Sequence, residues 1–111
     1  MRQLCLACLM LCLSSAASHA LDSGQQHGKA LLQKLCSRCH AIGTTGVSPH
    51  PDAPPFRTFG EQKLYDEDFA QRLQTGLSTI HKDMPTFRFG PADAEAVVGY
   101  LRAIQIHQRP K

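Results

Sequence analysis

The string Cys36-Ser37-Arg38-Cys39-His40 constrains the fold of this chain more than any other feature. Two cysteines three residues apart lie on the same side of one helical turn, so both thiols can add to the two vinyl groups of a haem. The histidine that follows can offer a neutral imidazole to the iron. C-x-x-C-H is the pattern of c-type haem attachment. The motif predicts one haem c held covalently by Cys36 and Cys39, with His40 as an iron ligand.

Three other uses of C-x-x-C compete with this interpretation. A thioredoxin-like redox pair requires a βαβ context, and no strand pattern precedes Cys36. A zinc site requires four ligands, and no second cysteine pair follows. A structural disulfide between Cys36 and Cys39 would close a very small loop and constrain little of the unfolded chain. The pentapeptide favours haem over all three.

The first twenty residues have the pattern of a secretory signal peptide. A positive start at Arg2 precedes an apolar run from Leu4 to Leu13, and Ser18-His19-Ala20 offers small residues where a signal peptidase reads the chain. A membrane-spanning helix needs ~20 apolar residues, so a retained anchor is the weaker alternative. We expect cleavage after Ala20, one mature domain over residues 21–111, and a periplasmic location. Export also favours haem, because covalent attachment in bacteria is completed outside the cytoplasm.

Cleavage would leave Met84 as the only methionine of the mature chain, in His81-Lys82-Asp83-Met84-Pro85. Pro85 favours extended backbone at Met84, which suits a loop that brings sulfur to a metal. His/Met ligation of haem iron is well precedented and raises the reduction potential. We therefore predict Met84 as the second iron ligand. His81 is the main rival, and core packing of Met84 is the other alternative.

The charge pattern excludes one class of partner. The chain has 12 Lys+Arg against 9 Asp+Glu, a formal net charge of +3. No basic run or stripe occurs, so nothing indicates nucleic-acid binding. We expect modest electrostatic steering and a small, transient docking surface for redox proteins. Basic residues that could ring an exposed haem edge, with scattered solubilising charge as the alternative, are Lys29, Lys34, Lys63, Lys82 and Arg88.

The remaining sequence predicts an all-α domain of three to four helices with long loops. Apolar positions at helical spacing indicate helices over 25–39 and 64–77, and Pro91 with Asp93 indicates the start of a third. Between the first two, residues 43–60 hold three glycines and four prolines, which predicts a loop with no element of its own. Wrapping the edge of a cofactor would explain so long a loop.

These motifs together resemble the class I (mitochondrial-type) bacterial monohaem cytochromes c. The resemblance spans residues 21–111. It rests on Gly28 and Leu32 before the haem motif, on Ala53-Pro54-Pro55-Phe56, on Met84-Pro85 and on Val97-x-x-Tyr100-Leu101. It implies a cytochrome c fold wrapped around one haem, in which the N- and C-terminal helices cross at these residues. Leu32 departs from the family, which often has an aromatic residue there.

The resemblance also implies roles for residues around the iron. A proline carbonyl of the loop after the motif accepts a hydrogen bond from the ligand histidine. Pro54 matches it by spacing, with Pro55 left open. Arg57 is a candidate partner for a haem propionate, and a solvated arginine is the alternative.

With His40 and Met84 both bound, no iron position is open, so we expect a periplasmic one-electron carrier rather than an enzyme. It would be a monomer without a membrane span, passing electrons between a periplasmic dehydrogenase or cytochrome complex and an acceptor such as an oxidase. One alternative is a haem protein with an open or labile sixth site, acting in gas sensing or peroxidase-like chemistry. The other is a dedicated cytochrome subunit of a periplasmic dehydrogenase.

Overall fold

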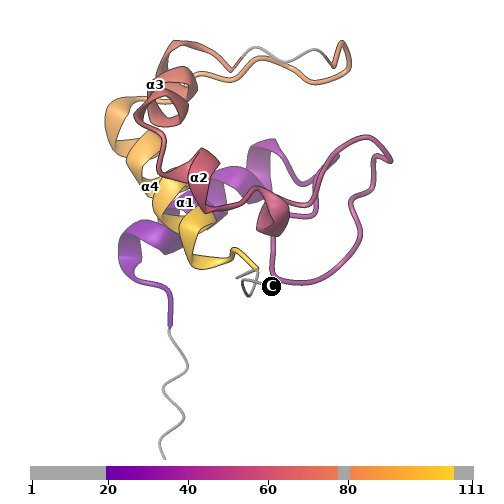
Figure 1. Cartoon of the computed structure of the whole chain (residues 1–111), viewed down its shortest axis with the longest axis horizontal. Helices are drawn as coiled ribbons and strands as arrows, with labels where there is room; N and C mark the ends of the chain where they lie inside the picture. Colours follow the sequence, from indigo (N-terminus) through magenta and orange to yellow (C-terminus); the bar gives the residue numbers. More distant parts are fainter. Residues whose placement is uncertain (1–19, 78–80, 107–111) are drawn as a thin grey trace, which may run out of the picture.

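The computed structural model describes residues 20–77 and 81–106 (Figure 1). These residues form four α-helices and one 3₁₀ turn, and the described part contains no strand. The elements are α1 (Ser23–Leu35), η1 (Phe56–Thr58), α2 (Glu61–Leu64), α3 (Glu67–Thr75) and α4 (Pro91–Ala103). The all-α fold expected from the sequence is confirmed. The expected leader, residues 1–20, lies outside the described residues apart from Ala20.

Helix α1 delivers the haem motif and ends just before it. Its N-terminus is a capping box in which the Asp22 carboxylate accepts from the Gln25 backbone N–H at 2.7 Å and the Gln25 side chain accepts from the Asp22 N–H at 3.0 Å. The expected extension of this helix to Cys39 is wrong. After Leu35 the N–H groups of Cys39 and His40 both point at the Cys36 carbonyl, at 3.1 and 2.9 Å, so the chain tightens into turns.

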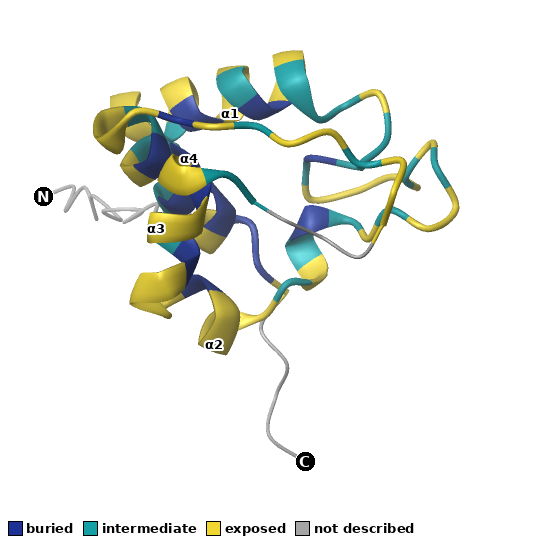
Figure 2. Cartoon of the chain, turned by 90° about the horizontal axis from the view of Figure 1, so that it is seen from above, coloured by how far each residue is buried: buried dark blue, intermediate teal, exposed yellow. Residues whose placement is uncertain are grey.

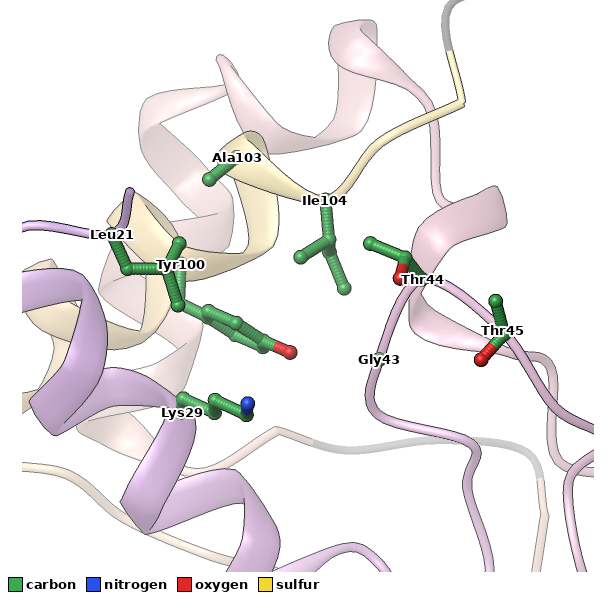
Figure 3. Close-up of a pocket in the computed structure, with 8 residues that line it drawn as sticks. All are labelled: Leu21, Lys29, Gly43, Thr44, Thr45, Tyr100, Ala103 and Ile104. Carbon is green, nitrogen blue, oxygen red and sulfur yellow. The ribbon is translucent and has the colours of Figure 1, made fainter. Parts of the chain in front are cut away.

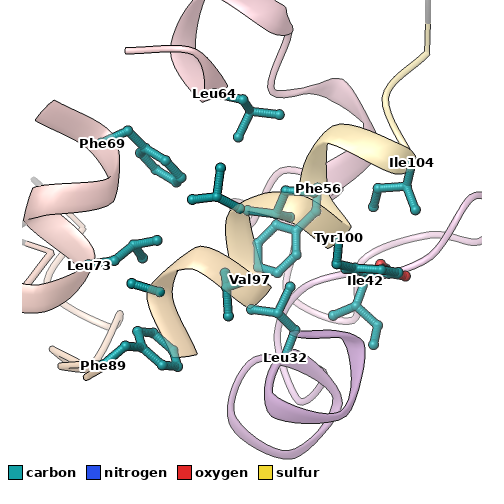
Figure 4. Packing of buried hydrophobic residues seen from close by; sticks show 13 residues of the cluster. Leu32, Ile42, Phe56, Leu64, Phe69, Leu73, Phe89, Val97, Tyr100 and Ile104 are labelled. Atoms are coloured by element: carbon teal, nitrogen blue, oxygen red, sulfur yellow. The ribbon is translucent and has the colours of Figure 1, made fainter. Parts of the chain in front are cut away.

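Helices α1 and α4 form the most extensive helix pair, as the resemblance implied. They meet at Gly28, where a Cβ would lie 2.1 Å from the Ala96 carbonyl oxygen. Only the absence of a side chain allows the two backbones to approach this closely. Leu32, Val97 and Tyr100 are buried around this contact, within the apolar cluster that Figure 4 shows.

The expected helix over 64–77 is wrong in one respect, because the segment contains a break. Helix α2 stops at Leu64, and α3 begins after Asp66, which has extended backbone and accepts from the Asp68 N–H at 3.0 Å. A new N-cap at Asp66 thus starts a second helix. The long loop also differs from expectation, because η1 interrupts it.

The core is centred on α4, which packs against α1, α2 and α3 and carries many of the buried residues (Figure 2). Leu64, Phe69 and Leu73, three of the apolar residues in the segment 64–77, are all buried. Helix α4 begins with Pro91 in its first turn, as predicted, and carries Asp93 there. No helix of the described residues is both long enough and apolar enough to cross a membrane.

Candidate haem site

A cavity of about 910 Å³ opens beside the haem motif. The volume falls within the ~300–1,000 Å³ typical of cofactor and ligand pockets. Cys36, Cys39 and His40 line it at the end of α1, and Met84 lines it from the connection between α3 and α4. Most of the wall is apolar. The apolar side chains come from every helix except α2, and include Leu32, Leu35, Phe56, Phe59, Phe69, Leu73, Leu77, Phe87, Phe89, Val97 and Leu101.

The His40 imidazole is held in one tautomer. Its Nδ1 lies 2.8 Å from the Pro54 carbonyl oxygen. A carbonyl can only accept, so Nδ1 carries the proton and donates, and the Nε2 lone pair is left for a metal. The contact falls on Pro54 and not on Pro55. The imidazole ring also packs against the Phe56 ring, with 4.5 Å between the ring centroids.

The backbone around this histidine is fastened at several points. The Phe56 N–H donates to the Ala41 carbonyl at 3.0 Å, which closes the loop back onto the residue after His40. The Ala41 N–H in turn donates to the Ser48 hydroxyl at 2.9 Å. The loop of residues 41–55 is therefore tied to itself beside the cavity, and it carries Pro54 to the imidazole.

Met84 lies in the loop between α3 and α4, as predicted, and the residues just before it form a turn. Its N–H donates to the His81 carbonyl at 3.1 Å, and its side chain is half-buried. His81 also lines the cavity but is exposed. The structure thus brings the thioether of Met84 and the imidazole of His40 to one cavity across 44 positions of sequence, and it brings His81 there as well.

Two other histidines, His27 and His50, are held by polar contacts of their own. His27 Nε2 lies 2.7 Å from the Asp93 carboxylate, which joins α1 to the first turn of α4 away from the cavity. His50 lines the cavity, but its Nδ1 accepts from the Asp52 N–H at 3.1 Å. Neutral His50 therefore carries its proton on Nε2, which faces Asp83 at 3.9 Å. His107 lies outside the described residues.

The two cysteines are half-buried and form no disulfide with each other. Burial raises the pKa of the Cys36 thiol to about 11, and the neighbouring Cys39 adds to the rise. A nucleophilic redox cysteine has a lowered pKa, so this environment is unlike that of a thioredoxin-type pair. Among the described residues no cluster of three His, Cys, Asp or Glu side chains could hold a metal ion by itself. The donor set and the apolar cavity fit a haem.

Comparison with known protein families decides the identity. The family model described as cytochrome c matches residues 25–105, which is most of the chain. The chain belongs to the cytochrome c family. The resemblance to class I cytochromes c is thereby confirmed. Searches of curated proteins and of solved structures gave no match. Its cofactor is haem c, attached covalently at the C-x-x-C-H cysteines, and its general function is electron transport.

The cytochrome has a predominantly basic rim around the cavity, which we define as the charged residues that line it. The rim contains two acidic residues, Asp52 and Asp83, and more basic ones, which are Lys34, Arg38, Lys63, Arg72 and Lys82. Sequence reasoning missed Arg38 and Arg72. Arg38 lies inside the haem motif, and Arg72 lies between the buried residues Phe69 and Leu73 of α3. The sequence position of each arginine could therefore have indicated that it lies near the haem.

Two basic residues that the sequence offered as candidates for the haem edge, Lys29 and Arg88, lie outside the rim. Lys29 lines a smaller cavity of about 430 Å³ between the start of α1, the end of α4 and the loop at Gly43 (Figure 3). Arg88 does not line the haem cavity. The smaller cavity contains neither a thiol nor an imidazole in its wall.

Arg57 also lies outside the haem cavity. Its Nη2 donates to the Gly46 carbonyl at 2.8 Å, and its Nη1 is buried. The guanidinium therefore fastens the loop at Gly46 and is not a freely solvated side chain. A contact between Arg57 and a haem propionate stays a prediction.

Proposed function

We propose that this cytochrome is a one-electron carrier whose haem iron is ligated by His40 Nε2 and Met84 Sδ. The observation that carries the proposal is the hydrogen bond from His40 Nδ1 to the Pro54 carbonyl at 2.8 Å, in the wall of a cavity that Met84 also lines. Bound haem supplies an iron centre that gains and loses one electron.

The chain's own residues determine how that centre behaves. Pro54 keeps the proton on Nδ1, so Nε2 stays an electron-pair donor. The Met84 thioether favours reduced iron, and this raises the reduction potential. The apolar wall limits water near the cofactor, which also disfavours the more charged oxidised form. Two protein ligands leave no position for a substrate, so we propose electron transfer and no catalysis.

We also propose that the carrier acts in the periplasm and meets its partners through the basic rim. The leader pattern in residues 1–20 supports export. The excess of positive side chains around the cavity supports a partner with an acidic docking face, such as an acidic region of a dehydrogenase or oxidase. The mass of the exported holoprotein tests the location, because we expect residues 21–111 plus one haem.

The ligand proposal is tested by visible spectra of the full chain expressed with its leader, compared with Met84→Ala. We expect a c-type spectrum on reduction in both. The oxidised parent should show a weak far-red sulfur-to-iron band that Met84→Ala lacks. His81→Ala is the matched control, because it removes the rival ligand from the same turn, and it should keep the band.

Each other outcome contradicts a definite part of the proposal. Covalent haem without the far-red band in the parent would show that Met84 is not the ligand. Absence of the band in the parent, with a low-spin oxidised spectrum that changes in His81→Ala and not in Met84→Ala, would assign His81 as the ligand instead. Absence of covalent haem would refute the cofactor itself and return Cys36 and Cys39 to the disulfide interpretation.

A further inference from the structure

Gln105 is the one buried amide side chain among the described residues, and both its nitrogen and its oxygen make hydrogen bonds. It follows α4, and it is only 7% exposed. Its Nε2 donates to the Phe56 carbonyl and to the Leu101 carbonyl, both at 2.8 Å. Its Oε1 accepts from the Gly60 N–H, also at 2.8 Å. A buried amide so completely satisfied fixes the groups that it binds.

Two of the groups that Gln105 binds, the Phe56 carbonyl and the Gly60 N–H, lie outside α4. They bracket a short segment that forms one side of the haem cavity. Phe56 and Gly60 stand at its ends, and η1 and Phe59 lie between them. The chain turns sharply at Gly60, whose φ of +84° is in the left-handed region. Gln105 therefore clamps this wall segment from both ends.

The clamped segment contacts the proposed iron ligand. The Phe56 ring lies 4.5 Å from the His40 ring, and Phe59 lies 5.0 Å from Phe56. Lys63 Nζ lies 4.7 Å from the centre of the Phe59 ring, at the outer end of this row. Pro54, which accepts the His40 hydrogen bond, precedes Phe56 by two residues. A shift of Phe56 would move both neighbours of the imidazole.

We propose that Gln105 is a positioning residue that sets the reduction potential through Phe56 and His40. The inference rests on the proposed function and extends it to a residue outside the cavity wall. The Phe56 peptide is held from two directions, because its N–H donates to Ala41 and its carbonyl accepts from Gln105. Without the amide, the Phe56 carbonyl and the Gly60 N–H lose buried partners and the segment moves toward water.

Water beside the cofactor stabilises the more charged oxidised state, so the potential should fall. The test compares the midpoint potential of wild-type holoprotein with that of Gln105→Met, which keeps the side-chain volume and removes the hydrogen bonds. We expect a threefold to tenfold shift of the one-electron equilibrium toward oxidised protein, where tenfold corresponds to about 59 mV. The matched control is Gln74→Met on α3, whose exposed amide makes one 3.4 Å bond within its own helix.

A general loss of stability is separated from positioning by two further readouts. The first is the set of paramagnetically shifted haem methyl resonances of the oxidised protein, which report the orientation of the axial ligands. These should move in Gln105→Met and stay in Gln74→Met. The second is a double-mutant cycle with Phe56→Leu. If Gln105 acts through Phe56, the two shifts in potential will not add.

A Gln105→Met protein with wild-type potential and wild-type haem methyl resonances would overturn the inference, as would fully additive shifts. If Gln105→Met does not retain haem, the midpoint potential of Phe56→Leu tests the inference instead. This variant removes the ring contact with His40 and leaves the backbone hydrogen bond to Gln105. An unchanged potential there would refute the route through His40. Failure of the proposed function is distinct, because it appears in the wild type as a missing far-red band.

Discussion

Single hydrogen bonds determine the chemistry of several side chains here. The bond from His40 to Pro54 fixes which imidazole nitrogen can bind a metal. The bond from the Tyr100 hydroxyl to the Ile42 carbonyl, 2.7 Å long, holds the chain just after the haem motif against α4. In both cases the acceptor is a backbone carbonyl, so the side chain has to keep its proton.

The Tyr100 bond predicts a pH dependence of stability. Burial raises the pKa of the Tyr100 hydroxyl above its ordinary 10.0, because ionised tyrosine would be a buried charge. A raised folded-state pKa gives stability that is present below the unfolded pKa and lost as pH rises past it. Urea denaturation of the holoprotein should therefore show wild-type stability falling above pH ~10, more steeply than for Tyr100→Phe.

At neutral pH the same comparison should favour the wild type by about 1 kcal/mol, the net contribution of one hydrogen bond. The difference should shrink as the pH rises through the tyrosine range. Tyr65 serves as an internal reference, because it is exposed and present in both proteins. A wild-type advantage that stays constant from pH 7 to pH 11 would contradict this account.

At the residue scale, the sequence identified the groups that line the cavity better than it identified their partners. The Cys36, Cys39 and His40 motif is local, so its meaning is carried by spacing alone. The choice between Pro54 and Pro55 depends on which carbonyl the folded loop turns inward, and spacing leaves that open. The role of Gln105 was missed because its partners at residues 56 and 60 are more than 40 positions away.

At the scale of elements, one contact between α1 and α4 organises the fold. Gly28 allows the helices to approach, and the haem motif follows directly from the same helix. Apolar spacing predicted α1, and Pro91 with Asp93 predicted the start of α4. Apolar spacing did not predict the break between α2 and α3, because Leu64 and Phe69 point inward on either side of it and preserve the pattern. The available signal for a second helix start is Asp66, because aspartate is favoured at the N-cap position.

The helix crossing is tested by a matched pair of glycine substitutions. In Gly28→Ala the new Cβ would meet the backbone carbonyl of Ala96, so the helices must separate. We expect a loss of about 2 kcal/mol or more, as for overpacked cores. In Gly99→Ala the Cβ would meet only the Gln25 side chain at 3.8 Å. That variant should gain up to ~1 kcal/mol from helix propensity.

Urea denaturation of the two holoproteins measures this difference. Equal stabilities for Gly28→Ala and Gly99→Ala would show that the crossing tolerates a methyl group. The close approach at Gly28 would then have no energetic role.

At the scale of the whole molecule, charge is unevenly distributed although the formal total is small. The chain carries a formal charge of +3, whereas the rim alone holds five basic residues against two acidic ones. Acidic residues gather instead at α2 and the start of α3, at Glu61, Asp66, Glu67 and Asp68. The sum of charges follows from composition alone, but this separation does not, because only the fold places Lys29 and Arg88 away from the cavity.

The separation predicts how electron transfer responds to salt and to charge reversal. Oxidation of the reduced protein by an anionic complex such as ferricyanide should slow as ionic strength rises. Lys34→Glu combined with Lys63→Glu should slow it severalfold at low salt. The control pair, Lys29→Glu with Arg88→Glu, changes the net charge equally but lies off the rim, and it should have a smaller effect. Equal effects from both pairs would mean that only net charge matters.

The central claim is that His40 and Met84 both bind the iron, so that the protein carries electrons and binds no exogenous ligand. Carbon monoxide titration of the reduced holoprotein, followed by its visible spectrum, tests this most directly. We predict no binding by the wild type at concentrations that saturate Met84→Ala, in which one iron position is open. Ready binding of carbon monoxide by the wild type would contradict the account and indicate a haem with an open or labile sixth site.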